Sequence, residues 1–249
     1  MRTATEYNQA YYGELTAGRE NYWRLMPAPK MRIAHITGLI ANERPQFSSA
    51  CDFGCGNGGL LREIAVRFPH ATLSGLDLSE EQVNQNRQSM PGLSWAQQDL
   101  AATDYRYPFG APCDVAISSE VIEHLDRPEE YLRNIHASLQ EGGLLVLTTQ
   151  SGPVHTTETH VGHIRHWEPD EMRSVLQAVG FGNPRVYNCG WPFHDWSKRA
   201  ANLRPEQTIR RFGQTQWGSV ERLTAAVLRV LFRLNSSTRG YQLVALATR

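Results

Sequence analysis

The sequence predicts an α/β protein with a doubly wound parallel sheet, and three observations lead to this fold class. Between about residues 48 and 190, short apolar segments alternate with helical patterns, as they do when helices connect parallel strands. A glycine-rich turn joins the first apolar segment to the first helical pattern. The chain has 249 residues, of which 41% are hydrophobic, so it can bury the core of one such domain with appendages.

Apolar runs indicate the strands, and helical periodicity with capping residues indicates the helices. Ser79 before two acidic residues predicts a helix start, and Gly142-Gly143 is expected to end the helix that begins at Pro128. Ligands of such sheets bind at the carboxyl ends of the strands, so we expect the site there. The expected strands are 48–53, 72–77, 93–97, 113–118, 143–149, 184–189 and 241–248. The expected helices are 58–68, 79–88, 128–140 and 168–179.

Three parts of the chain are expected to differ in role. Residues 1–45 form an N-terminal helical arm, residues 46–190 with 240–249 form the core, and residues 191–239 form a helical insertion that covers the substrate. Helical spacing is clear at Ile33, Ile36 and Ile40, and Pro27 with Pro29 breaks the pattern before it. The arm is also aromatic, which fits either packing on the domain or a lid over the cofactor cleft. Its aromatic residues are Tyr7, Tyr11, Tyr12, Tyr22 and Trp23.

The insertion combines basic side chains with an apolar helical stripe. We expect an amphipathic helix packed on the domain with its basic face in solvent, and the alternatives are an acidic or phosphorylated substrate or a membrane surface. The stripe consists of Val220, Leu223, Val227, Val230, Leu231 and Leu234. The basic residues are Lys198, Arg199, Arg204, Arg210, Arg211, Arg222, Arg229, Arg233 and Arg239, against Asp195, Glu206 and Glu221. Residues that could line an acceptor pocket are Trp191, Phe193, Trp196 and Trp217.

Composition excludes several classes of protein. Formal charges sum to zero and the pI is about 7.1, which argues against a broad nucleic-acid surface. Met1 to Glu6 open no apolar run and no segment is long and apolar enough to cross a bilayer, so we expect a cytoplasmic protein. The cysteines form no C-x-x-C pair and are expected to be small buried side chains in a reducing cytosol. They are Cys51, Cys55, Cys113 and Cys189.

The turn at Asp52-Phe53-Gly54-Cys55-Gly56-Asn57-Gly58 predicts a nucleotide cofactor. Glycines let a ligand lie against bare backbone, and the following helix offers unpaired N–H groups. Asp77 follows about 20 residues later, at the end of the second strand, where such folds place the acid that binds ribose. A nicotinamide dinucleotide prefers Gly-x-Gly-x-x-Gly, whereas the glycines here are one residue apart throughout, which favours S-adenosylmethionine.

With these motifs the chain resembles the class I S-adenosylmethionine-dependent methyltransferases, over about Phe47–Tyr187 and Tyr241–Thr248. Two further matches are Gln98-Asp99-Leu100 and Cys113 to Ser119. The resemblance implies a Rossmann-like, seven-stranded, mostly parallel sheet with the last strand antiparallel. It also implies that Asp77 binds the ribose, Asp99 the adenine, and the Ser118 carbonyl the sulfonium end. The implied cofactor-binding residues are Asp52, Gly54, Cys55, Gly56, Asp77, Leu78, Asp99, Leu100 and Ser118.

A second cluster carries the chemistry of the acceptor. Glu120, Glu123 and His124 follow the fourth strand and would share one helix face, where two carboxylates and an imidazole suit a divalent cation. Glu-x-x-Glu-His resembles two groups, the ubiquinone-biosynthesis O-methyltransferases and the small-RNA 2′-O-methyltransferases. In both, the motif and a later histidine hold a metal that lowers the pKa of the acceptor hydroxyl. The later position is matched best by His163, with His160 and His166 as rivals.

We therefore expect S-adenosylmethionine-dependent methyl transfer to a small molecule, most readily at a hydroxyl. The expected catalytic residues are His124, His163 and Glu120, and the expected ligands of Mg²⁺ or another divalent cation are Glu120, Glu123, His124 and His163. The alternatives to the metal are a lone histidine base or a structural role for the motif. The alternative functions are N- or C-methylation, small-RNA methylation, nicotinamide-dependent redox chemistry and a non-catalytic binding protein. We expect a small-molecule partner and no nucleic acid, and a homodimer is the assembly to test.

Overall fold

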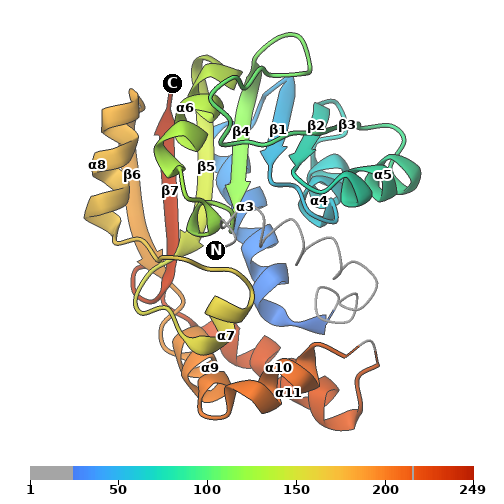
Figure 1. The fold of residues 1–249 in the computed structure, drawn as a ribbon, viewed down its shortest axis with the longest axis vertical. Coiled ribbons are helices and arrows are strands. Elements are labelled where there is room, and N and C mark those ends of the chain that lie inside the picture. The colour runs from blue at the N-terminus through green and yellow to red at the C-terminus, as the bar shows by residue number, and fades with distance from the viewer. Residues whose placement is uncertain (1–24, 215) are drawn as a thin grey trace.

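The sheet forms as the strand patterns predict. A computed structural model describes residues 25–214 and 216–249, which form one seven-stranded sheet with helices on both faces (Figure 1). The sheet order is β3-β2-β1-β4-β5-β7-β6. Its strands are β1 (Ser49–Phe53), β2 (Thr72–Asp77), β3 (Ser94–Gln97), β4 (Cys113–Ser119), β5 (Leu139–Gln150), β6 (Gly182–Cys189) and β7 (Gln242–Thr248).

Strand direction also agrees with the expected topology. Neighbouring strands from β3 to β5 pair in parallel, and β7 runs antiparallel to both β5 and β6. Six strands that run in one direction, with the reversed strand β7 inserted between β5 and β6, make the mixed Rossmann-like sheet that the resemblance implies. The carboxyl ends of the parallel strands therefore meet at one edge.

Alternating side chains divide the core between the two faces of the sheet. Along β4, Ala116 belongs to the core on one face, while Val115 and Ile117 belong to the core on the other. The first face is covered by α6 (Pro128–Ser138) and α8 (Pro169–Val179). The second is covered by α3 (Pro27–Glu43), α4 (Gly59–Arg67) and α5 (Glu80–Ser89).

The helix that begins at Pro128 ends earlier than predicted. It was expected to run to the Gly142-Gly143 pair, but α6 stops at Ser138 and β5 begins at the buried Leu139. Leu139 pairs with Cys113, and the ladder resumes only at Leu144, so β5 carries extra residues at this point. Gly142 has φ +69°, which a glycine adopts without strain. The glycines therefore permit a bulge within a strand and do not end the helix.

Part of the N-terminal arm is confirmed as a helix. Helix α3 starts at Pro27, where the fixed φ of proline suits the first turn, and it buries Ile36 and Ile40 against the sheet. The prolines thus begin this helix. The aromatic residues from Tyr7 to Trp23 lie outside the described residues, so their expected packing or lid role is a prediction that the structure does not test.

The insertion lies beyond the carboxyl ends of the parallel strands (Figure 1). It consists of α9 (Phe193–Asn202), α10 (Pro205–Phe212), α11 (Ser219–Leu231) and the 3₁₀ helix η2 (Phe232–Leu234). Helix α7 (Thr156–His160), which follows β5, lies on the same side (Figure 1). Among the described residues, no helix combines the length and the apolarity needed to cross a membrane.

One expectation for the insertion is wrong. The apolar stripe of α11 was expected to pack on the domain, but most of it faces solvent; Leu223, for example, is 66% exposed. The helix is instead buried along another face, through the side chains of Ala225 and Glu221. Phe232 of η2, directly after the helix, is buried as well. A periodic pattern shows that a helix has an apolar face, but it does not tell what covers that face. The four cysteines are buried and free, as expected.

Candidate functional site

The glycine turn after β1 is held against β2 by its backbone. The N–H groups of Gly54 and Cys55 both donate to the carbonyl of Leu76, at 2.8 and 2.9 Å. Gly54 has φ +94°, and a Cβ there would lie 2.4 Å from Cγ2 of Val121. Any side chain at this position would therefore disturb the segment that leads into the acceptor cluster. The turn ends at Gly58, and α4 begins at the next residue.

Asp77, at the end of β2, organises the turn. Its Oδ2 accepts from the Gly56 N–H at 2.8 Å, and its Oδ1 accepts from the Ser79 N–H at 2.9 Å. A carboxylate can accept about four hydrogen bonds, so Asp77 keeps the capacity to accept from a hydroxyl group of a ligand. Burial raises the pKa of Asp77, and the bonds from Ser79 and Gly56 oppose that rise.

Asp52 is the buried acid of the turn. It is 2% exposed, and its Oδ1 has no hydrogen-bond partner among the described residues. Burial and the nearby charge of Asp77 raise the pKa of Asp52 to about 7. A buried carboxyl with an unused oxygen and a raised pKa is suited to a cationic ligand, whose charge would restore its ionisation.

The remaining predicted cofactor residues lie on neighbouring strand ends. Asp99 follows β3, where its Oδ1 accepts from the Ala101 N–H at 2.9 Å and its Oδ2 lies 3.8 Å from the Arg127 guanidinium. Ser118, near the end of β4, is fully buried, and its Oγ lies 2.8 Å from the Tyr131 hydroxyl. Cys55 and Leu100 are buried, and Leu78 is half-buried next to Asp77. The predicted residues therefore meet along one edge of the sheet.

The Glu120–His124 motif is not the helix face that its spacing predicts. Glu120 has φ +58°, an uncommon conformation for a residue with a side chain, and its N–H donates to the Thr148 carbonyl at 2.9 Å. Only residues Ile122–His124 are helical, in the 3₁₀ helix η1. Because the chain turns sharply at Glu120, the side chain of Glu120 does not share a helix face with those of Glu123 and His124.

Three of the four predicted metal ligands come together. Glu123, His124 and His163 each offer a ligand atom, and these atoms lie within 4.8 Å of one another. Glu123 is fully buried, its Oε2 accepts from the Thr149 hydroxyl at 2.8 Å, and its Oε1 has no hydrogen-bond partner in the described chain. Burial, with the charge of Glu120 added, raises the pKa of Glu123 well above its usual value. A buried acid with an unused oxygen beside two imidazoles is a set of groups that a cation would satisfy.

Glu120 is engaged elsewhere. Its carboxylate accepts hydrogen bonds from the side-chain amides of Gln150 and Gln242, and it lies 3.7 Å from the Arg32 guanidinium of α3. Burial would raise the pKa of Glu120, but Arg32 and the two amides outweigh burial and lower it. Glu120 is therefore a fixed negative charge beside the cluster of Glu123, His124 and His163.

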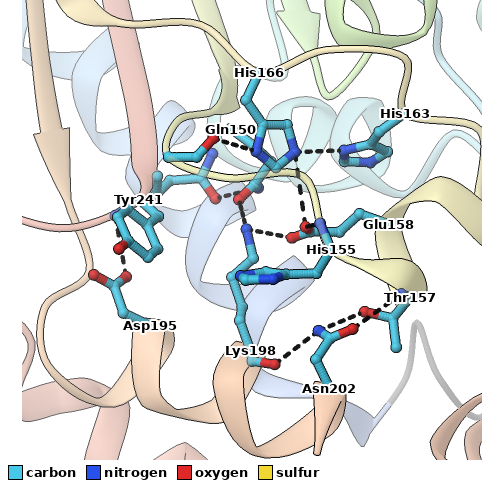
Figure 2. Close-up of polar contacts among 12 residues, drawn as sticks. Gln150, His155, Thr157, Glu158, His163, His166, Asp195, Lys198, Asn202 and Tyr241 are labelled. Atoms are coloured by element: carbon cyan, nitrogen blue, oxygen red, sulfur yellow. Dashed lines mark hydrogen bonds and ion pairs between the residues drawn. The ribbon is translucent and has the colours of Figure 1, made fainter. Parts of the chain in front are cut away.

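The hydrogen bonds of His166 fix the tautomer of His163 (Figure 2). His166 Nδ1 lies 3.0 Å from the Gly152 carbonyl, which can only accept, so this nitrogen carries the proton. His166 Nε2 then accepts from His163 Nδ1 at 3.0 Å, which leaves His163 Nε2 with a lone pair. Burial, then repulsion from His124, lowers the pKa of His163 to about 2, and burial lowers that of His124 to about 4. Both imidazoles are neutral at physiological pH and can act as ligands or proton acceptors.

Two residues that contact the histidine cluster were missed by the sequence analysis. Lys198 of α9 donates to Oε1 of Gln150 at 2.7 Å and lies 2.5 Å from the carboxylate of the buried Glu158 (Figure 2). Glu158 also lies 3.9 Å from His166 Nε2, so the pair reaches the histidines. Lys198 was counted only among the basic residues of the insertion, and Glu158 lies just before the histidine-dense segment. No local pattern joins residues 40 positions apart.

The aromatic residues of the insertion form two separate sets of ring contacts. Trp196 contacts Trp191 at 5.7 Å and Phe193 at 5.5 Å between ring centroids, and both tryptophans are partly exposed. Trp217 is buried and contacts Phe212 instead. The four residues expected to line an acceptor pocket are therefore not all in contact with one another.

Comparisons with known proteins show the family to which the chain belongs. A family model described as a methyltransferase domain matches residues 22–184. The malonyl-[acyl-carrier protein] O-methyltransferase of Halalkalibacterium halodurans is 33% identical over 161 residues, which are 64% of this chain and 56% of that protein. The ubiquinone biosynthesis O-methyltransferase of Caulobacter sp. (strain K31) is 33% identical over 146 residues, 57% of each chain. This chain thus matches little more than half the length of these relatives.

Solved structures support the fold. The N-methyltransferase NodS from Bradyrhizobium japonicum WM9, in complex with S-adenosyl-l-homocysteine, has a TM-score of 0.60 to this chain. The comparison covers 97% of this chain and 98% of that one, at 16% sequence identity. At this identity the likeness concerns the arrangement of the strands and helices, and the acceptor has to be argued from the site itself.

Proposed function

Because this chain belongs to the class I S-adenosylmethionine-dependent methyltransferases, we propose that it methylates an oxygen atom of a small-molecule acceptor, bound beside Glu123, His124 and His163. The family match over residues 22–184 and the mixed seven-stranded sheet establish the membership. The single observation that carries the choice of an oxygen acceptor is the convergence of one buried carboxyl group and two neutral imidazoles. Glu123 and His124 follow β4, His163 lies in the segment after β5, and the cluster is at the sheet edge where we expect the cofactor.

The chain itself brings cofactor and acceptor together. Ser118 ends the cofactor half of the site, and Glu123 follows only five residues later in η1. The methyl group of a sulfonium is already activated, so the protein has to place the acceptor atom in line with it and provide for the acceptor's proton. Where no cation is bound, the lone pair on His163 Nε2 would accept this proton, because the bond to His166 holds the ring in one tautomer.

The same residues fit a divalent cation. Glu123, His124 and His163 would hold it, and the unpartnered Oε1 of Glu123 is the oxygen that such an ion would satisfy. When bound, the cation would lower the pKa of an acceptor hydroxyl. The depressed pKa values of the two histidines favour a ligand role, because a metal requires neutral imidazole, whereas a general base works best with a pKa near the working pH. Glu120 is not proposed as a ligand in this arrangement.

We also propose that residues 191–239 cover the acceptor. The support is Lys198, which reaches from the insertion to Gln150 at the end of β5 and to Glu158 beside the histidines. The O-methyltransferases among the relatives are consistent with an oxygen acceptor, and the ubiquinone biosynthesis enzymes with a small-molecule one. A homodimer remains a proposal that sedimentation velocity would test.

The test is transfer of labelled methyl from S-adenosylmethionine into a panel of small hydroxyl, carboxyl and amine compounds, with Mg²⁺ and again with EDTA. Glu123→Gln and His163→Gln should each lower the rate by about 100-fold or more, while the exposed His70→Gln should leave it unchanged. Titration of Mn²⁺ followed by electron paramagnetic resonance tests the cation independently of turnover. Mn²⁺ should bind one site, and Glu123→Gln should abolish that binding.

The outcomes separate the parts of the proposal. Label on nitrogen or carbon would overturn the oxygen acceptor and support the alternative N- or C-methyltransferase. Full activity in EDTA together with no bound Mn²⁺ would overturn the cation and leave His163 as the proton acceptor. Unchanged activity in both the Glu123 and His163 variants would overturn the acceptor site as a whole.

A further inference from the structure

The outward face of α11 is apolar. Val220, Leu223, Val227, Val230 and Leu234 are 55%, 66%, 48%, 61% and 67% exposed. These residues are three or four positions apart, so they form one continuous stripe along α11 and η2. At 1.5 Å per residue the stripe is about 20 Å long. The described residues contain eleven large hydrophobic side chains that are exposed, and five of them lie in this stripe, which is a patch and not scatter.

A row of arginines runs beside the stripe. Arg222, Arg229 and Arg233 are exposed and lie seven and four residues apart, so they share one edge of the helix. Hydrogen bonds to backbone carbonyls hold two of these side chains in place. Arg222 donates to the Trp217 carbonyl at 3.1 Å, and Arg229 donates to the Leu25 carbonyl at 3.3 Å. The outward face of α11 therefore presents hydrocarbon with a parallel line of positive charge.

Within the described part of the chain, no carboxylate forms an ion pair with Arg222, Arg229 or Arg233. The only acid between residues 219 and 234 is Glu221, which is buried and accepts from the Arg211 guanidinium at 2.9 Å. A second copy of this face would bring arginines and apolar side chains but no exposed acid to pair with them. Charge complementarity therefore favours an anionic partner over self-association through α11.

We propose that α11 docks on the surface of a membrane that contains anionic phospholipids. The apolar stripe would enter the boundary between headgroups and acyl chains. The arginines beside it would bind the lipid phosphates in the headgroup layer. The helix would lie on the membrane, since none of the described helices can span one. This inference does not depend on the acceptor proposed above.

The test uses the full-length protein and sedimentation with vesicles. Vesicles of phosphatidylcholine and phosphatidylglycerol in equal amounts are compared with vesicles of phosphatidylcholine alone. The wild-type protein should sediment with the anionic vesicles and be released by added salt, because exposed charges are screened. Changing all three arginines to glutamine should weaken binding on the order of 100-fold, since each contributes about fivefold. The variant Leu223→Ser/Val227→Ser/Val230→Ser should lose at least about tenfold.

Helix α4 offers a matched control. It exposes Val66, at 77%, between the exposed Arg62 and Arg67, on a different helix. The variant Arg62→Gln/Val66→Ser/Arg67→Gln should bind vesicles like the wild-type protein. Thermal unfolding of all variants checks that they fold, and large changes are not expected because every substituted side chain is exposed.

Three results would overturn the proposal. The first is equal binding of the wild-type protein to both kinds of vesicle, or no binding to either. The second is vesicle binding that the α11 variants keep or that the α4 control loses equally. The third is a wild-type protein that binds no vesicles and forms a dimer, when the Leu223/Val227/Val230 variant is a monomer. That result would assign the stripe to contact with a second copy of the chain.

Discussion

Replacing Asp52 by asparagine should change how the free energy of unfolding depends on pH. Burial and the charge of Asp77 raise the pKa of this carboxyl group to about 7 from a usual value of 3.8. The shift is about three pKa units, and each unit corresponds to about 1.4 kcal/mol. Ionised Asp52 therefore costs the folded protein about 4 kcal/mol when no ligand is bound.

The direction in which the free energy of unfolding changes with pH follows from proton binding. Between about pH 4 and pH 7 the unfolded chain has released the proton of Asp52, while the folded protein still holds it. The folded state binds more protons in this range, so stability falls as the pH rises and stays low above pH 7. Asparagine does not titrate. The difference in stability between the variant and the wild-type protein should therefore shift by up to about 4 kcal/mol in favour of the variant from about pH 4 to about pH 8.

Urea unfolding at several pH values in this range measures the difference, with the exposed Asp104→Asn as a matched control. Saturating S-adenosylmethionine should reduce the pH-dependent shift, because its positive charge near Asp52 would stabilise the ionised carboxyl group. Stability curves of the variant and the wild-type protein that stay parallel over the whole range would refute the reasoning. A shift that the cofactor leaves unchanged would remove Asp52 from the cofactor site.

Three further predictions follow from contacts in the site. Gly54→Ala should destabilise the protein by roughly 2 kcal/mol and abolish cofactor binding, because the new Cβ meets Val121 and φ is +94°. Asp77→Ala should weaken the binding of S-adenosylmethionine by about 1–3 kcal/mol in calorimetry, since charge-assisted hydrogen bonds are lost. Lys198→Met should lower the free energy of unfolding by roughly 3 kcal/mol, because it leaves the buried carboxylate of Glu158 without its cation.

Each of these predictions has its own control. Gly92→Ala adds a Cβ where no atom lies within 4 Å, so it should be neutral, and equal damage in both glycine variants would contradict the argument from Gly54. Asp77→Asn preserves the shape of the side chain, and binding within about twofold of wild type in both Asp77 variants would overturn the ribose assignment. Glu158→Gln should largely rescue Lys198→Met; additive effects in that double-mutant cycle would mean that the pair is not coupled.

The geometry of the glycine turn and its contact with Asp77 could be predicted from the sequence because these contacts are local. Asp52, the glycines and Asp77 lie within 26 consecutive residues, and one strand-turn-helix-strand unit is enough to bring them together. Turn chemistry and strand periodicity report on such a unit directly. The seven strands were predictable for the same reason, whereas the bulge in β5 was not, because the Gly142-Gly143 pair is equally compatible with a helix end.

The acceptor half depends on contacts between distant residues. Glu120 takes its partners from α3, β5 and β7, through Arg32, Gln150 and Gln242, and no sequence spacing reveals this set. The motif therefore predicted four metal ligands, whereas the folded chain brings only three of them into one cluster. Helix α11 shows the same limit, since its pattern predicted an apolar face but not the direction in which that face points.

The two glutamates of the motif are best understood together. Arg32 and two amides lower the pKa of Glu120 against the effect of burial, and the charge of Glu120 adds to burial in raising the pKa of Glu123. Pairs of carboxyl groups whose environments drive their pKa values apart mark different chemical roles. The partners of Glu120 thus stabilise its charged form, whereas burial disfavours the charged form of Glu123. Since Arg32 belongs to α3, this helix contributes a charge beside the cluster of Glu123, His124 and His163 without belonging to the sheet.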